Sequence, residues 1–194
     1  KGKFQEKGNL PSFFELYQKN VLILGFGRIG QAVAKRCLGF EMNVYVYDPY
    51  VEKNVIESFG GNKVDNLKDS VRTADYISIH IPINNETKNL FNMQMLKIMK
   101  NTAIIINTAR GGVINEIDLD QALRNKEIFA AGLDVFEKEP PDQNNPLLKN
   151  DKVLLSPHSS SFTKECKSRM GVETVQNLID FFENKIKKSM VVKL

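Results

Sequence analysis

The sequence lacks the features that would place it outside the ordinary globular proteins. No stretch approaches the run of about 18 apolar residues that a transmembrane helix needs, so we predict no membrane contact. Its two cysteines, Cys37 and Cys166, are too few for a disulfide framework and do not sit in metal-type spacing. We therefore predict no metal site and favour a reducing compartment.

The composition that remains is typical of one folded domain. The chain has 194 residues, of which 42% are hydrophobic and 26% charged, and a domain spans roughly 100–200 residues. The net charge of +4 is small. Much of the basic charge lies near the two ends, at Lys1, Lys3, Lys7, Lys185, Lys187, Lys188 and Lys193. Such runs are usually solvated, and without a recognition motif they predict no nucleic-acid binding.

Short apolar runs alternate with amphipathic stretches along most of the chain. The apolar runs predict buried parallel strands at 21–24, 43–47, 76–81, 103–107, 128–133 and 153–155. The amphipathic stretches predict helices at 29–38, 51–59, 93–99, 116–124 and 163–184. This alternation is typical of βαβ units, so we predict a Rossmann-type doubly wound parallel α/β sheet with helices on both faces.

A glycine-rich loop, Gly25-Phe26-Gly27-Arg28-Ile29-Gly30, follows the first predicted strand and opens the first helix. Gly25 allows the tight turn, Gly27 lets a pyrophosphate approach the backbone, and Gly30 lets the helix pack close to the strand. The phosphates then lie at the positive end of the helix dipole. A strand before the loop and a helix after it are the context that a dinucleotide-binding motif requires.

An acidic residue, Asp48, follows the second predicted strand, 18 residues beyond the last glycine. A carboxylate at this place accepts hydrogen bonds from the adenosine ribose and repels a 2′-phosphate, which favours NAD over NADP. Asp48-Pro49 is also an ordinary turn signal. A methyltransferase with a similar glycine loop is the main alternative to an NAD-binding protein.

The residues after the later strands indicate the chemistry. Arg110, beside two glycines, has room to hold a carboxylate by two parallel hydrogen bonds, although a surface arginine in a turn is the simpler interpretation. The two histidines, His80 and His158, both lie at strand ends and can transfer protons near neutral pH. Glu139 is a candidate partner for His158, because a nearby carboxylate favours the imidazolium, but nothing local shows that the two loops meet.

Taken together, these segments resemble the NAD-binding domain of the D-isomer-specific 2-hydroxyacid dehydrogenases. The matching segments are 21–30, 47–49, 80–82, 86–88, 107–112, 132–136, 139–141, 145–147 and 157–158. The resemblance implies that Arg110 binds the substrate carboxylate, His158 is the general acid and base, and Glu139 raises the basicity of His158. It also implies cofactor contacts from Arg28, Ile29, Asp48, Ile81, Thr108, Ala109, Asp134, Ser160 and Ser161.

The chain departs from the family in two respects. Where the family usually has glycine-rich small residues after its histidine, this chain has three serines and a phenylalanine at 159–162. The family's substrate domain precedes the glycine loop, and residues 1–19 are too short to be that domain. We therefore expect 1–19 to be a lead-in from an N-terminal substrate domain, 20–184 the NAD-binding domain and 185–194 a tail. The resemblance also implies a homodimer formed through the NAD domain.

The specific member of the family is less sharply indicated. Residues 163–165, Thr-Lys-Glu, resemble the stretch after the histidine in D-3-phosphoglycerate dehydrogenases, which favours that subfamily and serine biosynthesis. Glyoxylate or hydroxypyruvate reductases and D-lactate dehydrogenases share the other motifs. Formate dehydrogenases pair their histidine with a glutamine, which argues against them. An NAD(H)-sensing corepressor, or a fragment that binds no ligand, is an alternative of another class.

The compartment is predicted only in outline. The chain opens with Lys1, and residues 1–11 contain no apolar segment typical of a signal peptide. We expect a cytoplasmic protein that acts on a small carboxylate substrate. Targeting to an organelle stays open, because a transit peptide would lie upstream of Lys1.

Overall fold

The computed structural model describes residues 14–187 and residue 191, and it forms two compact units that divide between Leu155 and Ser156. The first, which we call the sheet unit, contains all the described strands. The second, the helix unit, contains one long helix. The domain boundaries predicted at 19/20 and 184/185 stay predictions, and residues 1–13 of the predicted lead-in lie outside the described residues.

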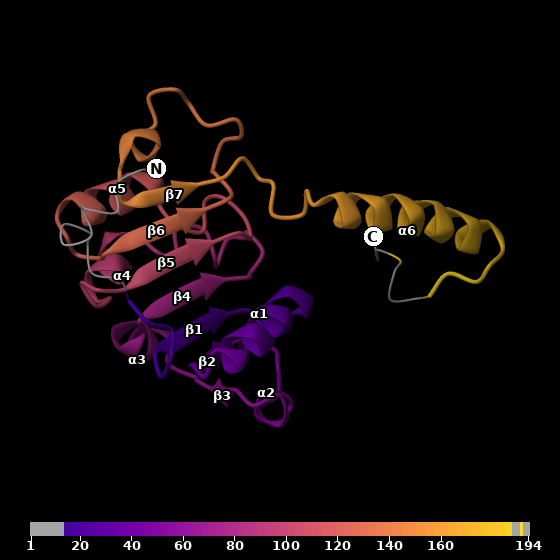
Figure 1. The fold of residues 1–194 in the computed structure, drawn as a ribbon, viewed down its shortest axis with the longest axis horizontal. Helices are drawn as coiled ribbons and strands as arrows, with labels where there is room; N and C mark the ends of the chain where they lie inside the picture. Colours follow the sequence, from indigo (N-terminus) through magenta and orange to yellow (C-terminus); the bar gives the residue numbers. More distant parts are fainter. Residues whose placement is uncertain (1–13, 188–190, 192–194) are drawn as a thin grey trace, which may run out of the picture. The chain divides into compact units, whose positions relative to one another are not determined.

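The sheet unit contains one sheet of seven strands in the order β3-β2-β1-β4-β5-β6-β7. Every neighbouring pair is parallel, and the strand arrows in Figure 1 point in one direction. The strands are β1 (Asn20–Leu24), β2 (Asn43–Tyr47), β3 (Asn62–Lys63), β4 (Tyr76–Ile79), β5 (Ile104–Asn107), β6 (Ala130–Leu133) and β7 (Val153–Leu155). The order reverses between β1 and β4, so the loops after these two strands flank the switch point at which such sheets bind ligands.

Helices cover both faces of this sheet. They are α1 (Arg28–Gly39), α2 (Lys53–Ser58), α3 (Leu67–Thr73), α4 (Met93–Lys97), α5 (Glu116–Arg124) and the 3₁₀ helix η2 (Pro146–Lys149). Side chains alternate between the faces of a strand, so β1 contributes to two separate cores. Ile23 packs in the core that contains Ala34 of α1. Leu22 packs in the opposite core, which contains Leu96 of α4 and Leu119 of α5. The predicted Rossmann-type doubly wound α/β fold is confirmed.

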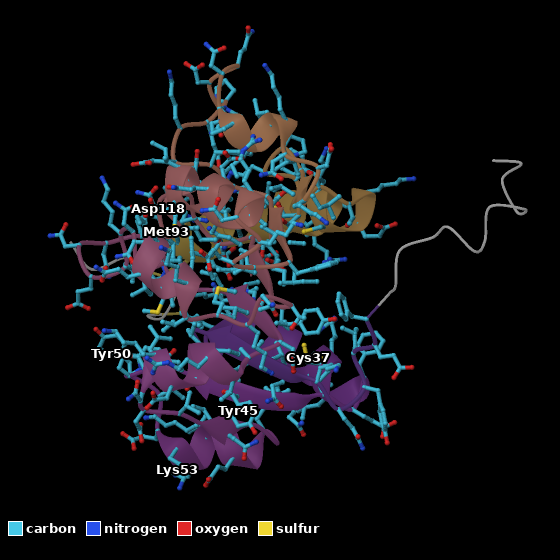
Figure 2. The ribbon with its side chains drawn as sticks, turned by 90° about the vertical axis from the view of Figure 1, so that its left-hand side faces the viewer. Cys37, Tyr45, Tyr50, Lys53, Met93 and Asp118 are labelled. Carbon is cyan, nitrogen blue, oxygen red and sulfur yellow. The ribbon has the colours of Figure 1, made fainter. Side chains whose placement is uncertain are left out.

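Asparagine side chains begin several of these helices. Asn66 accepts from Asp69 at the start of α3, Asn92 from Met95 at the start of α4, and Asn115 from Asp118 at the start of α5. Each bond satisfies a backbone N–H that the helix itself leaves without a partner. A further bond joins two helices, because the Met93 N–H donates to Asp118 Oδ2 over 2.8 Å (Figure 2). This bond therefore fixes the first turn of α4 relative to the first turn of α5.

The helix unit contains α6 (Lys164–Phe182), which begins after Thr163. The Thr163 hydroxyl accepts the Cys166 N–H over 3.1 Å and caps the helix. None of the residues of α6 is buried, although Met170, Val175 and Leu178 follow the spacing of an amphipathic face. Across the described helices, none has the length and apolarity needed to cross a membrane.

Candidate functional site

The glycine-rich loop lies directly after β1, at the reversal point of the sheet. Gly25 has φ +87°, a left-handed conformation that favours glycine. Its N–H donates to the Tyr47 carbonyl over 3.0 Å, and a Cβ at Gly25 would lie 2.7 Å from the His80 carbonyl oxygen. Gly25 therefore joins the ends of β2 and β4 at a point where no side chain fits.

The other two glycines of the loop differ in what surrounds them. A Cβ on Gly30 would overlap the Gly25 carbonyl oxygen, so this glycine allows α1 to pack closely against the loop. A Cβ on Gly27 would meet no heavy atom of the described residues within 4 Å, so this position faces open space. Gly27 is also the N-cap of α1, whose first turn has neither a side-chain cap nor an acidic residue. The positive end of the α1 dipole is thus open to an anion.

Asp48 lies beside this loop at the end of β2. Its Oδ2 accepts the Phe26 N–H over 2.8 Å, and its Oδ1 accepts the Tyr50 N–H over 2.9 Å. Each carboxylate oxygen can accept more than one hydrogen bond. The Asp48 carboxylate can therefore hold the loop and still accept bonds from the hydroxyls of a ribose.

A cavity of about 380 Å³ connects these residues. It is lined from the ends of β1, β2 and β4, with Gly25, Gly27, Asp48, Tyr50 and Ile81 among its walls. A second cavity of about 280 Å³ lies along the same edge of the sheet and shares His80, Ile81 and Pro82 with the first. An extended ligand can occupy both, with its phosphates near Gly27 and its two ends in different cavities.

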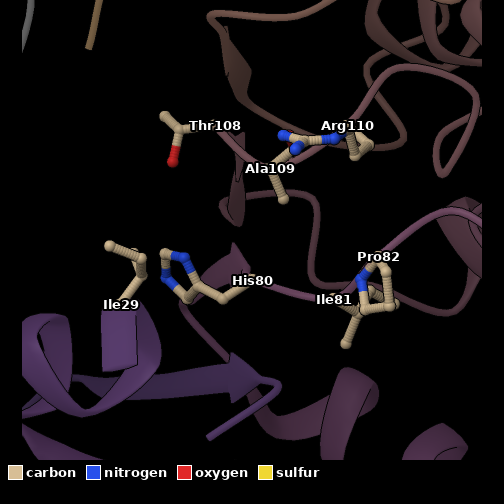
Figure 3. A pocket seen from close by; sticks show the side chains of 7 residues that line it. All are labelled: Ile29, His80, Ile81, Pro82, Thr108, Ala109 and Arg110. Atoms are coloured by element: carbon tan, nitrogen blue, oxygen red, sulfur yellow. The ribbon is translucent and has the colours of Figure 1, made fainter. Parts of the chain in front are cut away.

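The second cavity brings together residues that the sequence analysis assigned to cofactor and substrate. Figure 3 shows Thr108, Ala109 and Arg110 on one side, and Ile29, His80, Ile81 and Pro82 on the other. The lining includes one cationic side chain, Arg110, among mostly apolar ones. This arrangement suits a flat ring with a carboxylate beside it.

His80 differs from the histidine that an acid–base reaction needs. Burial lowers the pKa of His80 from 6.5 to about 4, because the charged imidazolium loses its hydration. The His80 Nε2 lies 2.8 Å from the Ser78 hydroxyl, and its Nδ1 has no hydrogen-bond partner within the described part of the chain. The His80 ring is therefore neutral at physiological pH and serves as a wall of both cavities.

Arg110 lies in a loop that Asn107 shapes from the end of β5. The Asn107 side chain is buried, accepts the Ala109 N–H over 3.0 Å and donates to the Arg110 carbonyl over 2.8 Å. The Arg110 Nη1 donates to the Ala109 carbonyl over 2.6 Å. These bonds fix the loop from which Arg110 lines the second cavity.

The loop after β6 contacts the Arg110 loop. A Cβ on Gly111 would overlap the peptide bond between Phe136 and Glu137, so the two backbones touch at Gly111. Three residues on, the Glu139 Oε1 accepts the Phe136 N–H over 3.0 Å. Asp134 is buried at the end of β6, and its N–H donates to the Asn107 carbonyl over 3.0 Å. The sheet unit thus brings the loops of Arg110 and Glu139 together.

The third predicted catalytic residue, His158, belongs to the helix unit, as do Ser160 and Ser161. His158 has φ +50°, an uncommon conformation for a residue other than glycine. The convergence of His158 with Arg110 and Glu139 therefore stays a prediction. So does the cofactor contact expected of Ser160 and Ser161.

Part of the cavity wall was not predicted from the sequence. Leu67, Asn84, Thr87 and Leu90 line the first cavity and were not assigned to it. For Asn84 and Thr87 a local signal exists, because Asn84 Oδ1 accepts the N–H of Thr87 and the Thr87 hydroxyl donates to the Pro82 carbonyl. Asparagine with a threonine three residues later is typical of a side-chain-stabilised turn. The sequence holds no such signal for Leu67 and Leu90.

Comparison with known proteins gives a consistent result. Residues 1–160 match the family described as D-isomer specific 2-hydroxyacid dehydrogenase, NAD binding domain. A D-3-phosphoglycerate dehydrogenase of Methanocaldococcus jannaschii is 40% identical over 177 residues, which cover 91% of this chain and 34% of that protein. A glyoxylate reductase of Aeropyrum pernix is 41% identical, with 91% of this chain and 52% of that protein covered.

The solved structures give the same fold. The D-lactate dehydrogenase of Lactobacillus jensenii, determined with NAD⁺, superposes with a TM-score of 0.84 at 29% identity, covering 98% of this chain and 62% of that one. The chain spans between about a third and about half of the length of the two curated relatives. The open space at Gly27, the uncapped start of α1 and the Asp48 carboxylate all fit a bound NAD. The chain belongs to the D-isomer specific 2-hydroxyacid dehydrogenase family, of which it is an NAD-binding domain.

Proposed function

We propose that the protein containing this chain is an NAD-dependent dehydrogenase that transfers a hydride between NAD(H) and a D-2-hydroxy acid or its 2-keto acid. The observation that carries the proposal is the backbone contact between the Arg110 loop and the Glu139 loop beside the second cavity. Arg110, which can hold the carboxylate of a substrate, and Glu139, whose own carboxylate can pair with an imidazole, then lie on adjoining loops.

The cofactor would lie along the carboxyl edge of the sheet. Asp48 would accept hydrogen bonds from the hydroxyls of the adenosine ribose, and the backbone N–H groups of Arg28 and Ile29 would donate hydrogen bonds to the phosphates. Ile81, Thr108 and Ala109 would hold the nicotinamide end, and Asp134, Ser160 and Ser161 are proposed as further contacts there. When bound, NAD(H) supplies or accepts the hydride.

The protein's own side chains would bind the substrate and move the proton. Arg110 would hold the substrate carboxylate through parallel hydrogen bonds and so orient the carbonyl. His158 would give a proton to the ketone oxygen in reduction and take one from the hydroxyl in oxidation. Glu139 would favour the imidazolium form of His158 and fix the position of its ring.

Two variants of the full-length protein test this proposal. His158→Ala should lower kcat by about 10²–10⁴-fold, the range that a general acid or base contributes. Arg110→Ala should mainly raise KM for the 2-keto acid. Both should leave the Kd of NADH, measured by its fluorescence, close to that of the unchanged protein. Arg169→Ala, in an exposed part of α6, is the matched control. Wild-type turnover by both His158→Ala and Arg110→Ala would show that the assignment is wrong.

Among possible substrates we propose D-3-phosphoglycerate, in a step of serine biosynthesis. The stretch 163–165 and the relative from Methanocaldococcus jannaschii support it. Glyoxylate or hydroxypyruvate is the second candidate, since glyoxylate reductases are equally similar to this chain, and D-lactate is the third. Values of kcat/KM for these substrates, measured with NADH or NAD⁺, decide between them. The substrate with the highest kcat/KM identifies the subfamily.

An NAD(H)-sensing binding protein of the corepressor kind is the alternative from another class. It predicts saturable NADH binding with no turnover of any 2-keto acid. We also propose a homodimer formed through the NAD-binding domain and a cytoplasmic location. The mass in solution, measured by light scattering, tests the dimer, and cell fractionation tests the location.

A further inference from the structure

Glu116, the first residue of α5, contacts two separate points of the loop that contains Glu139. Its Oε1 accepts the Glu137 N–H over 2.6 Å. Its Oε2 accepts from the Asn145 side-chain amide over 2.6 Å. Glu139 lies between these two points in the chain, so a single carboxylate fastens the loop on both sides of it.

The start of α5 is itself well fixed. The Asn115 N–H donates to the Phe91 carbonyl over 3.0 Å, and the Asn115 side chain caps the helix by accepting the Asp118 N–H. Asp118 in turn accepts the Met93 N–H at the start of α4. The bonds of Glu116 therefore hold the Glu139 loop in a fixed position relative to α4 and α5.

Of the two residues that Glu116 binds, Glu137 lies next to groups that contact both the Arg110 loop and Glu139. Glu137 shares with Phe136 the peptide bond that touches Gly111, next to Arg110. The Phe136 N–H in turn donates to the Glu139 carboxylate. At the far end, Asn145 begins η2, where the Leu147 N–H donates to its side chain.

The second contact of Glu137 is weaker. Its carboxylate pairs with Lys88 at 3.8 Å, and both side chains are more than half exposed. Exposed ion pairs contribute little, whereas hydrogen bonds to an ionised carboxylate are among the stronger ones. Of the two side chains that contact Glu137, Glu116 therefore makes the stronger bond.

We infer that Glu116 is a positioning residue, which holds Glu139 and the adjoining Arg110 loop in place for the reaction by fastening both sides of the Glu139 loop. The inference rests on the proposed function, since it acts through Glu139. Glu116 itself would neither bind the substrate carboxylate nor transfer the proton.

Glu116→Gln tests the inference with the smallest change in shape. Glutamine has one oxygen to accept a hydrogen bond, and its amide group donates instead. It can keep one of the two bonds and must lose the other. Asn145→Asp loosens the same fastening from the other side, because aspartate still caps η2 but has no amide to donate to Glu116. Glu173→Gln, exposed in α6, is the control.

The readout is kcat/KM for 2-keto acid reduction against pH in the full-length protein, together with the Kd of NADH and the melting temperature. Reduction needs a protonated imidazole, so activity falls as pH rises. Glu139→Gln should move this fall to lower pH. Glu116→Gln and Asn145→Asp should move it in the same direction by less, and lower kcat about 10-fold, since small misplacements can cost up to about 10²-fold. The Kd of NADH should stay within about twofold.

The double variant Glu116→Gln/Glu139→Gln separates action through Glu139 from an independent effect. The pH at which its activity falls should coincide with that of Glu139→Gln alone, because the effects of residues that act through one another are not additive.

Failure of the inference is distinguishable from failure of the proposed function. If Glu139→Gln shifts the profile but Glu116→Gln and Asn145→Asp only lower the melting temperature, the role of Glu116 is purely structural and the inference is overturned. If Glu139→Gln leaves the profile unchanged, the proposed function is wrong, and the inference is wrong with it. If Glu116→Gln fails to fold, the profile of Asn145→Asp decides.

Discussion

The backbone N–H of Phe26 donates to Asp48 Oδ2 over 2.8 Å, which ties the glycine-rich loop to the end of β2. The same carboxylate accepts the Tyr50 N–H through its other oxygen. Asp48 therefore shapes the loop before any ligand is bound. The place for the phosphates and the place for the adenosine ribose are fixed relative to each other by one side chain.

Asp48→Asn should change the choice of cofactor. The amide keeps an acceptor for the Phe26 N–H but removes the charge that binds ribose hydroxyls strongly and repels a 2′-phosphate. Hydrogen bonds to charged groups contribute roughly 1.5–3 kcal/mol, so we expect the Kd of NADH to rise about 10-fold or more. The Kd of NADPH should stay constant or fall. Fluorescence titration with both cofactors measures the ratio, with the exposed Asp65→Asn as control. An equal loss for NADH and NADPH would contradict the role of Asp48.

Two glycines of one loop should respond differently to the same added methyl group. Gly27→Ala meets open space in the folded chain, so the melting temperature should hardly change, but the methyl group would occupy the approach of the pyrophosphate and weaken NADH binding. Gly30→Ala would overlap the Gly25 carbonyl and should destabilise the chain by about 1–3 kcal/mol or more. Thermal unfolding and NADH titration of both variants test this. A stable Gly30→Ala variant, or full NADH affinity in Gly27→Ala, would be inconsistent with the geometry.

Hydrophobic patterning predicted most of the strands and helices of the sheet unit. The strands at 43–47 and 153–155 and the helix at 116–124 agree with β2, β7 and α5 at both ends. Besides the 3₁₀ helix η2, the elements β3 and α3 were missed. β3 has two residues and pairs only with β2, and α3 buries only Val71, so neither leaves a hydrophobic pattern long enough to detect. Asn66 followed by Asp69 was an available signal for the start of α3.

The placement of the glycine loop and of Asp48 at adjoining strand ends was predictable from short local motifs. The glycine loop and Asp48 follow from local spacing, because each residue serves a nearby turn or strand end. The burial of His80 and the fastening of the Glu139 loop by Glu116 depend on contacts between distant segments, and no local pattern encodes them. The sequence favoured His158 only through its candidate partner Glu139 and the family resemblance, whereas the structure adds that burial makes His80 unsuited to carry a proton at neutral pH.

The burial of His80 should make the stability of the cofactor-free chain depend on pH. Its pKa is about 4 in the folded chain and 6.5 when exposed. Between these values the unfolded chain binds a proton that the folded chain does not, so the free energy of unfolding falls as pH falls. The contribution is complete above pH 6.5 and lost near pH 4. Allowing for the partial exposure of the ring, we expect a change of about 1–3 kcal/mol.

Urea unfolding at several pH values, for the unchanged chain and for His80→Asn, measures this dependence. The variant should show a flatter profile between pH 6.5 and 4. The carboxyls of Asp75 and Asp120 have pKa values below 3.8, lowered mainly by hydrogen bonds against the effect of burial, so their stabilisation is lost at more acidic pH and does not mask the result. Parallel profiles for the two proteins would show that His80 is not the cause.

The contact of Gly111 with the Phe136–Glu137 peptide should matter more for catalysis than for cofactor binding. In Gly111→Ala the added methyl group overlaps that peptide, so the Arg110 loop and the Glu139 loop must move apart. Because a displacement of about 1 Å can cost about 10²-fold in rate, we expect kcat/KM for a 2-keto acid to fall by about that factor in the full-length protein. The Kd of NADH should rise by a smaller factor than kcat/KM falls. Gly27 and Asp48, which would hold the phosphates and the adenosine ribose, lie on other loops, and only the nicotinamide contacts of Thr108 and Ala109 lie on the displaced one.

Gly39→Ala is the matched control, because a Cβ there meets no described atom within 4 Å and the residue ends α1 away from both loops. It should retain wild-type kcat/KM. If Gly111→Ala weakened NADH binding as strongly as it lowered turnover, the contact would serve mainly to hold the cofactor, and its proposed role in placing Arg110 and Glu139 for the reaction would be wrong. If Gly111→Ala kept full activity, the contact between the two loops would have no part in the reaction. The proposal that this contact places Arg110 and Glu139 for catalysis would then be wrong.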